Sequence, residues 1–368
     1  MIFGKRKKAA EPVILAEDQS PVCNVQAFVE DNGSCVYFYL WFDPGEERGR
    51  IKSCWVCNRG PAPQEIDGEA MDQGRAPMMP AEFVGHDPEG TELSGELSVV
   101  WFEEGDAAAL LEDGRLIAVI PGWSGEGFYG YSRYARGQGP FAWELDQAER
   151  VLQERTDRSK KYWEYIDGDY WEELQGRLMD ALSRFFGEYE NYYAIDGGHF
   201  PTKALVTGRK NGVRYAVTAG TCALVQPLVE QYFQEKAGDF RRIELGFACR
   251  EDSLDEESYR KALSYVSGQT QLPWGVISWL GHGHTIPCDA IDGFAAVMLL
   301  NAALMPELPS PDYGSFMGER VNLLWMVPLT ADEYQQARQL DLGSMMERCR
   351  CRLEELAVFD GKAKFSGD

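Results

Sequence analysis

Two tight-turn signals, one in each half of the chain, place the strongest constraint on the fold. Asp31-Asn32-Gly33 separates the β-rich runs CNVQAFVE and CVYFYLWF, and Asn211-Gly212 separates KALVTG from VRYAVTAG. An Asn-Gly turn between two β-rich runs predicts an antiparallel hairpin, because both turn residues tolerate positive φ. The sequence therefore predicts one hairpin over residues 23–42 and another over residues 203–220.

Helical patterns accompany these hairpins. Residues 145–165 form a charged run without Gly or Pro, which is typical of a solvated helix. Residues 171–185 carry apolar side chains at helical spacing, and we also predict a short helix over residues 106–112 and a final helix over residues 342–356. Hairpins mixed with helices favour an α+β or mixed α/β fold over a regular βαβ repeat.

The length of the chain favours two domains. A chain of 368 residues is long for one hydrophobic core, and 44% hydrophobic residues suffice for two cores. We place the boundary near Arg155, inside the charged helix. The predicted divisions are a flexible leader (1–20), a β-rich N-terminal domain (21–155), a domain with a mixed sheet and flanking helices (156–357) and a polar tail (358–368).

Charge and hydropathy narrow the classes of partner. The chain has 59 acidic against 36 basic residues, and a surface of that sign repels nucleic acid while attracting basic proteins. No apolar run reaches the length of about 20 residues that spans a bilayer. The N-terminus also lacks the apolar stretch of about 7–15 residues that a signal peptide needs. These features predict a cytoplasmic protein with a protein partner and no membrane contact.

The nine cysteines do not describe a disulfide scaffold, because they are odd in number and scattered through a long chain. Cys54 and Cys57 form a CxxC within an expected strand, and Cys349 and Cys351 form a CxC. A structural zinc site needs two suitable pairs, so we favour buried free thiols over zinc.

A stretch from Pro273 to Pro287, PWGVISWLGHGHTIP, combines two Trp and two of the four His residues. With the segments IELGFAC, VNLLWMVPLT and ADEY it resembles the suppressor-of-fused domain family over about residues 165–357. The most specific part is GHTIP, from Gly283 to Pro287, and His282 carries no family expectation. The resemblance implies a non-enzymatic protein-binding domain without a cofactor. Animal members hold a peptide of a transcription factor. Bacterial members look like immunity proteins, and residues 1–150 look like the accessory domain of some of those members.

The candidate binding residues follow from this resemblance and from their chemistry. We expect a partner to contact Trp279, His284 and Thr285 of the Pro273–Pro287 stretch and Trp123 of an aromatic, glycine-rich loop. An extended peptide adding a strand to a sheet is one physical route. We assign no catalytic, cofactor-binding or metal-binding residue, and the oligomeric state stays open.

Enzymatic alternatives rest on weaker patterns. His282 and His284 could bind zinc or iron, with His199, Cys288 or Asp289 as a third ligand, but no spacing ties these residues together. We favour a hydrogen-bonded His284 inside the turn.

Two further patterns in the first half of the chain also favour a structural interpretation. Glu103, Glu104 and Asp106 could act as acid and base, although consecutive acids after a strand are typical of a solvated loop. Gly125, Gly127 and Gly130 match GxGxxG, but the helix that a dinucleotide site needs does not follow.

Overall fold

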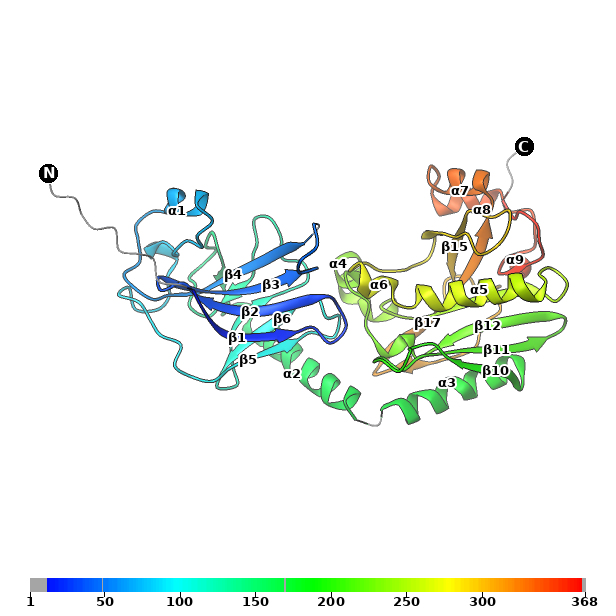
Figure 1. Cartoon of the computed structure of the whole chain (residues 1–368), viewed down its shortest axis with the longest axis horizontal. Helices are drawn as coiled ribbons and strands as arrows, with labels where there is room; N and C mark the ends of the chain where they lie inside the picture. The colour runs from blue at the N-terminus through cyan, green and yellow to red at the C-terminus, as the bar shows by residue number, and fades with distance from the viewer. Residues whose placement is uncertain (1–11, 48, 169, 366–368) are drawn as a thin grey trace. The chain divides into compact units, whose positions relative to one another are not determined.

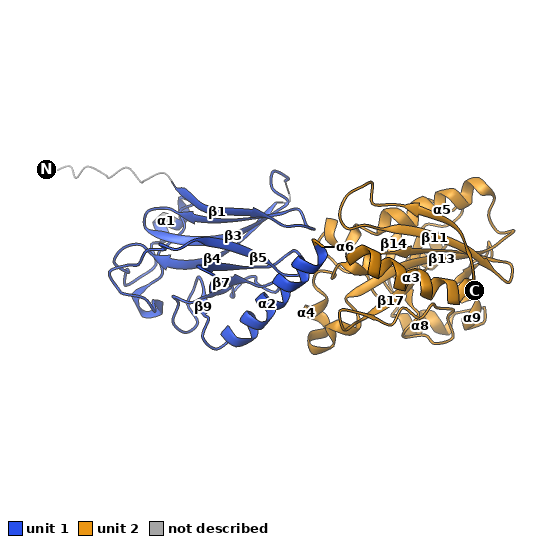
Figure 2. Ribbon diagram, turned by 90° about the horizontal axis from the view of Figure 1, so that it is seen from below, with its two compact units in different colours: residues 1–166 blue, residues 167–368 orange. Residues whose placement is uncertain are grey.

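The computed structural model describes residues 12–47, 49–168 and 170–365. The chain divides into two compact units, residues 1–166 and 167–368 (Figure 2). Strands of the described residues form three sheets, of four, five and nine strands (Figure 1). The predicted mixed α+β class is confirmed.

Unit 1 is built from two small sheets. The first sheet runs β1-β2-β3-β4 and the second β5-β6-β7-β8-β9, with neighbouring strands antiparallel except for β8 and β9. The sheets touch where Ser132 Oγ donates a hydrogen bond to the Val56 carbonyl, at 2.8 Å. The strands are β1 (Val13–Gln19), β2 (Val25–Asp31), β3 (Cys35–Phe42), β4 (Arg50–Asn58), β5 (Leu97–Trp101), β6 (Ala108–Glu112), β7 (Arg115–Ile120), β8 (Tyr131–Ser132) and β9 (Trp143–Glu144).

The helices of unit 1 are α1 (Gly68–Asp72), the 3₁₀ turn η1 (Ala81–Phe83) and α2 (Glu149–Ile166). The boundary that we predicted near Arg155 falls inside α2. The helix continues to Ile166 because its C-terminal half buries Ser159, Tyr162 and Ile166. Trp163 adds a hydrogen bond from its indole N–H to the Trp101 carbonyl, at 2.8 Å. These contacts place the whole helix in unit 1.

Unit 2 contains the nine-stranded mixed sheet. Its main path is β10-β11-β12-β13-β17-β15-β14, with β16 beside β17 and β18 beside β13. Strand β13 runs parallel to β17 and to β18, and the other pairs are antiparallel. The strands are β10 (Tyr189–Ala194), β11 (Ala204–Lys210), β12 (Val213–Ala219), β13 (Arg242–Arg250), β14 (Thr285–Pro287), β15 (Ala296–Asn301), β16 (Ser315–Phe316), β17 (Glu319–Leu329) and β18 (Val358–Phe359).

Helices cover both faces of this sheet. Phe186 of α3 stacks on Tyr215 of β12, while the next residue, Ala216, packs in the core that holds Tyr259 and Val266 of α5. Successive strand residues point to opposite faces, so α3 and α5 cover opposite sides. The helices and 3₁₀ turns are α3 (Tyr170–Phe186), η2 (Thr221–Ala223), α4 (Val229–Phe233), η3 (Gln234–Asp239), α5 (Glu256–Gln269), α6 (Leu272–Gly275), α7 (Ala331–Ala337), α8 (Leu342–Glu347) and α9 (Leu353–Leu356).

The expected leader and tail contain ordered structure. Strand β1 lies within residues 1–20 and pairs with β2, and its exposed Val13 and Ile14 explain why its sequence lacks a buried pattern. Strand β18 lies within residues 358–368, and Phe365 is fully buried. The remaining parts of these two predictions, residues 1–11 and 366–368, fall outside the described residues.

Two predicted helices are wrong. Residues 108–112 form strand β6, because the Asp113-Gly114 turn pairs them with β7 and their other edge pairs with β5. Residues 342–356 form two short helices, α8 and α9, separated by the cysteine-containing residues 348–352. Both predicted hairpins are confirmed.

Candidate partner-binding pocket

An apolar pocket of about 240 Å³ lies in unit 2, where the Pro273–Pro287 stretch meets three other segments. Its walls come from the end of α4, from the residue after η3 and the start of β13, from the loop before β14, from the end of β15 and the turn after it, and from β17. The lining residues are Phe233, Phe240, Ile243, Trp279, Leu280, Gly281, His282, Asn301, Leu304 and Leu324.

Aromatic rings form one side of the pocket. Phe233 stacks on Phe240 with ring centres 4.3 Å apart and meets Trp279 edge-on at 5.3 Å. The Trp279 ring also lies edge-on to His284, at 4.3 Å. A methyl group at position 281 would overlap the Trp279 ring, so Gly281 allows the ring to pack against its own backbone. Each edge-on or offset pair adds about 0.5–1.5 kcal/mol to the burial of the rings.

A buried glutamine fixes the backbone beneath Trp279. Gln226 is fully buried, and its side-chain oxygen accepts the N–H of Leu280 at 2.8 Å. Its side-chain nitrogen donates to the Leu280 carbonyl at 3.2 Å. The same amide thus satisfies both backbone groups of Leu280, which cannot reach water. Gln226 thereby holds the pocket loop in one position.

We predict that Gln226→Leu lowers the free energy of unfolding of unit 2 by about 1–3 kcal/mol, because it leaves two buried backbone groups without partners. Urea unfolding of the purified chain, followed by pulsed hydrogen exchange on unit 2 peptides, measures this change. Gln335→Leu on the exposed part of α7 is the matched control, with an expected change within about 0.5 kcal/mol. Equal changes in the two variants would contradict this role of Gln226.

The two histidines of the stretch have separate surroundings. Asn301 donates its backbone N–H to Nδ1 of His282 at 3.1 Å, which places the His282 proton on Nε2. His284 packs on Trp279 instead. Burial lowers the pKa of both imidazoles from the usual 6.5, so both are neutral at pH 7. The pocket therefore presents uncharged rings.

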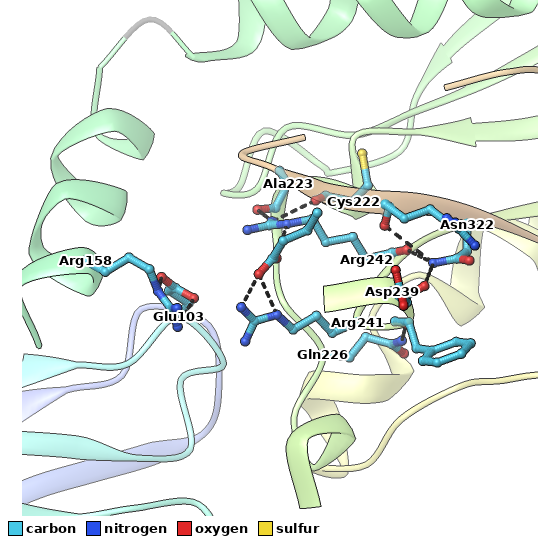
Figure 3. A network of polar contacts seen from close by, with 12 residues as sticks. Glu103, Arg158, Cys222, Ala223, Gln226, Asp239, Arg241, Arg242 and Asn322 are labelled. Atoms are coloured by element: carbon cyan, nitrogen blue, oxygen red, sulfur yellow. Dashed lines mark hydrogen bonds and ion pairs between the residues drawn. The ribbon is translucent and has the colours of Figure 1, made fainter. Parts of the chain in front are cut away.

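Charged and amide groups connect the pocket to the sheet (Figure 3). The Asn301 amide donates to Oδ1 of Asn322 at 3.0 Å, and the Asn322 amide donates to the carbonyls of Asp239 and Arg242 at 2.9 and 3.1 Å. Arg242, which is almost fully buried, donates to the carbonyls of Cys222 and Ala223. The pocket therefore rests on a hydrogen-bonded framework.

Glu319 supplies the carboxylate of this framework. Its Oε2 accepts from Nε of Arg242 and its Oε1 from Nε of Arg241, each at 2.8 Å. Arg241 and Arg242 are both buried, so a single carboxylate serves two buried guanidinium groups. These contacts join the start of β13 to the start of β17.

The structure gathers three of the four predicted binding residues. Trp279 lines the pocket, His284 packs on Trp279, and Thr285 begins β14, where it pairs with Met298. Trp123 belongs to unit 1, where its ring is 42% exposed and lies 5.9 Å from the Arg155 guanidinium. Trp123 is therefore an exposed aromatic of the first unit.

The candidate ligands of the metal alternative do not meet. His282 lies in a turn where Gly283 has φ +85°, so the two histidines do not project from one face of a strand. Across residues 12–47, 49–168 and 170–365, three or more His, Cys, Asp or Glu side chains nowhere gather in a way that could hold a metal ion. Thus His199, Cys288 and Asp289 do not complete a site with the histidine pair.

The acidic cluster of unit 1 is buried, whereas a solvated loop was the favoured interpretation. Glu103, Glu104 and Asp106 are each 5% exposed or less. Arg155 and Arg158 of α2 each lie 2.9 Å from a glutamate of the cluster, and Figure 3 shows the pair of Arg158 and Glu103. The glutamates therefore anchor α2 to the sheets of unit 1.

The other sequence motifs have structural roles. Strand β8, not a helix, follows Gly130, so the GxGxxG pattern lacks the helix of a dinucleotide site. Cys54 and Cys57 are buried free thiols, whereas Cys349 and Cys351 are half-buried.

Sequence reasoning missed the residues that complete the pocket. Phe233, Phe240 and Leu304 lie far from Trp279 in the sequence, and each is an ordinary apolar residue near a turn. Gln226 carried no signal beyond its place between apolar residues and Pro227. Only the three-dimensional approach of these segments identifies them.

Comparison with known proteins identifies the part of the chain that holds the pocket. Residues 197–360 match the family model described as Suppressor of fused protein (SUFU). A chain of the Sufu–Fu complex crystal structure is similar at 13% identity and a TM-score of 0.34, over 52% of this chain and 91% of that chain. No curated protein matches the chain. Within the part that the structure describes, helices of the length and apolar character needed to cross a membrane are absent.

All residues that line the pocket lie between Phe233 and Leu324, inside the matched range. The same range holds most of the nine-stranded mixed sheet and helix α5. Residues 197–360 therefore form a suppressor-of-fused family domain.

Proposed function

We propose that this chain is a non-enzymatic binding module that holds a protein partner at the pocket around Trp279. One observation carries the proposal, namely an aromatic pocket within the suppressor-of-fused domain that has exposed apolar side chains beside it. Aromatic side chains and well-packed pockets are the usual sites where a few partner residues supply most of the binding energy.

The surface around the pocket supports this function. Tyr232 and Leu304 are 65% and 47% exposed; the Tyr232 ring lies 5.4 Å from the Trp279 ring, and Leu304 lines the pocket. Single exposed apolar residues are ordinary, but a cluster around a cavity is typical of an interaction site. The neutral histidines and the two hydrogen bonds from Gln226 to the Leu280 backbone keep the rim of the pocket rigid. A rigid rim reduces the entropy lost on binding.

An extended segment of the partner fits the neighbouring sheet edge. Strand β14 ends the strand order, so among the described residues its outer side has no paired strand. Thr285 and Ile286 of β14 follow directly on His284, which packs on Trp279. A partner could add a strand to β14 while one of its apolar side chains enters the pocket.

The charge of the chain suggests the kind of partner. A formal net charge of −23 attracts basic proteins and speeds their association. We propose a bacterial, cytoplasmic immunity protein that neutralises a basic toxin by covering the surface with which the toxin meets its target. The affinity for such a partner falls as salt rises, because screening weakens the attraction.

The pocket itself is tested by a matched pair of variants. Leu304→Asn changes an exposed pocket residue, and Leu353→Asn changes a similarly exposed leucine of α9. We expect Leu304→Asn to weaken partner affinity at least about tenfold, because it removes a contact at the centre of the interface. Leu353→Asn should bind like the wild type. Calorimetry with the partner captured from native lysate measures both, and equal affinities would contradict the proposal.

A further inference from the structure

Residues 348–352, Arg-Cys-Arg-Cys-Arg, place two thiols beside each other between α8 and α9. The Sγ atoms of Cys349 and Cys351 lie 3.6 Å apart, and Cys349 Sγ lies 3.4 Å from the Cys351 carbonyl. A disulfide joins its sulfur atoms at about 2.0 Å. The side chains therefore already face each other at a separation that a small movement can close.

These two thiols differ from the other cysteines of the chain. All nine cysteines lie in the described residues, and seven of them are buried. Burial raises the pKa of each of those seven thiols, which keeps them protonated and unreactive. Only Cys349 and Cys351 combine solvent access with a neighbouring thiol.

Charged side chains flank the two thiols. Arg348, Arg350 and Arg352 are exposed and flank the two cysteines in the sequence. Burial, followed by the hydrogen bond and charge of Cys349, raises the pKa of Cys351 to about 11. Cys351 therefore ionises less readily than an ordinary thiol, and we assign the first attack to Cys349.

We propose that Cys349 and Cys351 form a reversible disulfide by exchange with a low-molecular-weight disulfide such as oxidised glutathione. The Cys349 thiolate attacks one sulfur of the reagent, which forms a mixed disulfide and releases one glutathione thiolate. Cys351 then gives up its proton and attacks Cys349 Sγ, which releases the second glutathione. Two protein thiols are oxidised, the reagent disulfide is reduced to two thiols, and the two protons pass to the glutathione thiolates.

We expect the disulfide to change how residues 364–365 are held against the rest of unit 2. Arg350, between the two cysteines, donates its backbone N–H to the Lys364 carbonyl at 3.0 Å. The next residue, Phe365, is buried and donates its N–H to the Glu333 carboxylate of α7. Closing a ring around Arg350 constrains the residue that holds this segment. Oxidation is therefore expected to change amide exchange at Arg350 and Phe365.

Treatment of the full chain with oxidised glutathione tests the proposal. Alkylation and peptide mass mapping should show that the peptide holding Cys349 and Cys351 loses two hydrogen atoms, takes up no alkylating reagent and retains no glutathione. Dithiothreitol should restore both thiols. Two unchanged thiols, a lasting mixed disulfide in the wild type or a disulfide between two chains would each overturn the proposal.

Two conservative variants test the order of the steps. In Cys351→Ser the second step cannot occur, so glutathione should remain on Cys349. In Cys349→Ser, Cys351 should react at least tenfold more slowly. The reverse pattern would overturn the assignment of Cys349 as the attacking thiol. The mass map of the wild type tests disulfide formation by itself, even if neither variant folds.

Discussion

Replacing Glu319 with alanine is expected to lower the free energy of unfolding of unit 2 by about 3–5 kcal/mol. Glu319 is the carboxylate shared by Arg241 and Arg242, whose side chains are 7% and 2% exposed. Removing it takes away a carboxylate that offsets the lost hydration of two buried guanidinium groups. Urea unfolding, with pulsed hydrogen exchange on peptides from β13 and β17, measures the change for unit 2 alone.

The control for this variant is Glu355→Ala. Glu355 forms a 2.8 Å ion pair with Arg352, but that arginine is 72% exposed. Exposed pairs contribute little to stability, because water and salt screen them. Similar losses in the two variants would show that the Glu319 framework does not stabilise the sheet beneath the pocket.

Asp106→Asn is expected to stabilise unit 1 above pH 6. Burial, with a smaller contribution from Glu104, raises the pKa of Asp106 from 3.8 to about 6. The folded state therefore holds this proton more tightly than the unfolded state, and the wild type loses stability as pH rises from about 4 to 6. A shift of this size corresponds to about 2–3 kcal/mol once Asp106 is ionised. Asparagine has a similar shape and carries no charge.

The pH profile distinguishes this charge effect from a change in packing. Urea unfolding of wild type and Asp106→Asn, followed on peptides from β6 and β7, should give equal stabilities near pH 4. The variant should be more stable at pH 7. A constant difference at every pH would show that the Asp106 charge is not the cause.

Local patterns predicted the parts of the fold that local chemistry determines. The Asn-Gly turns gave both hairpins, and α7 begins at a capping box of Thr330 and Glu333, which is also a local pattern. The helix prediction for residues 108–112 is wrong, because Ala and Leu favour a helix locally, whereas pairing on both edges makes these residues a strand. No Gly or Pro marks the break between α8 and α9 in the sequence. At this break the Arg350 backbone N–H donates a hydrogen bond to the Lys364 carbonyl.

The candidate site likewise contains some residues that the sequence singled out and others that only the fold brings together. Trp279 and His284 stood out because two Trp and two His within fifteen residues are unusual for a simple turn. The other walls of the pocket come from residues 233–240 and 301–304, which are brought together only by the sheet. Burial of Glu103, Glu104 and Asp106 could not be predicted, because it depends on Arg155 and Arg158 from a helix fifty residues away.

Hydrogen–deuterium exchange of the full chain, with and without its bound partner, tests the central claim most directly. If the partner occupies the pocket, amides in residues 229–240, 278–286 and 301–304 should exchange more slowly in the complex. These segments contribute the rings of Phe233, Phe240 and Trp279, the side chain of Leu304 and the edge of β14. Protection confined to unit 1 or to the β10 edge, with these segments unchanged, would contradict the account.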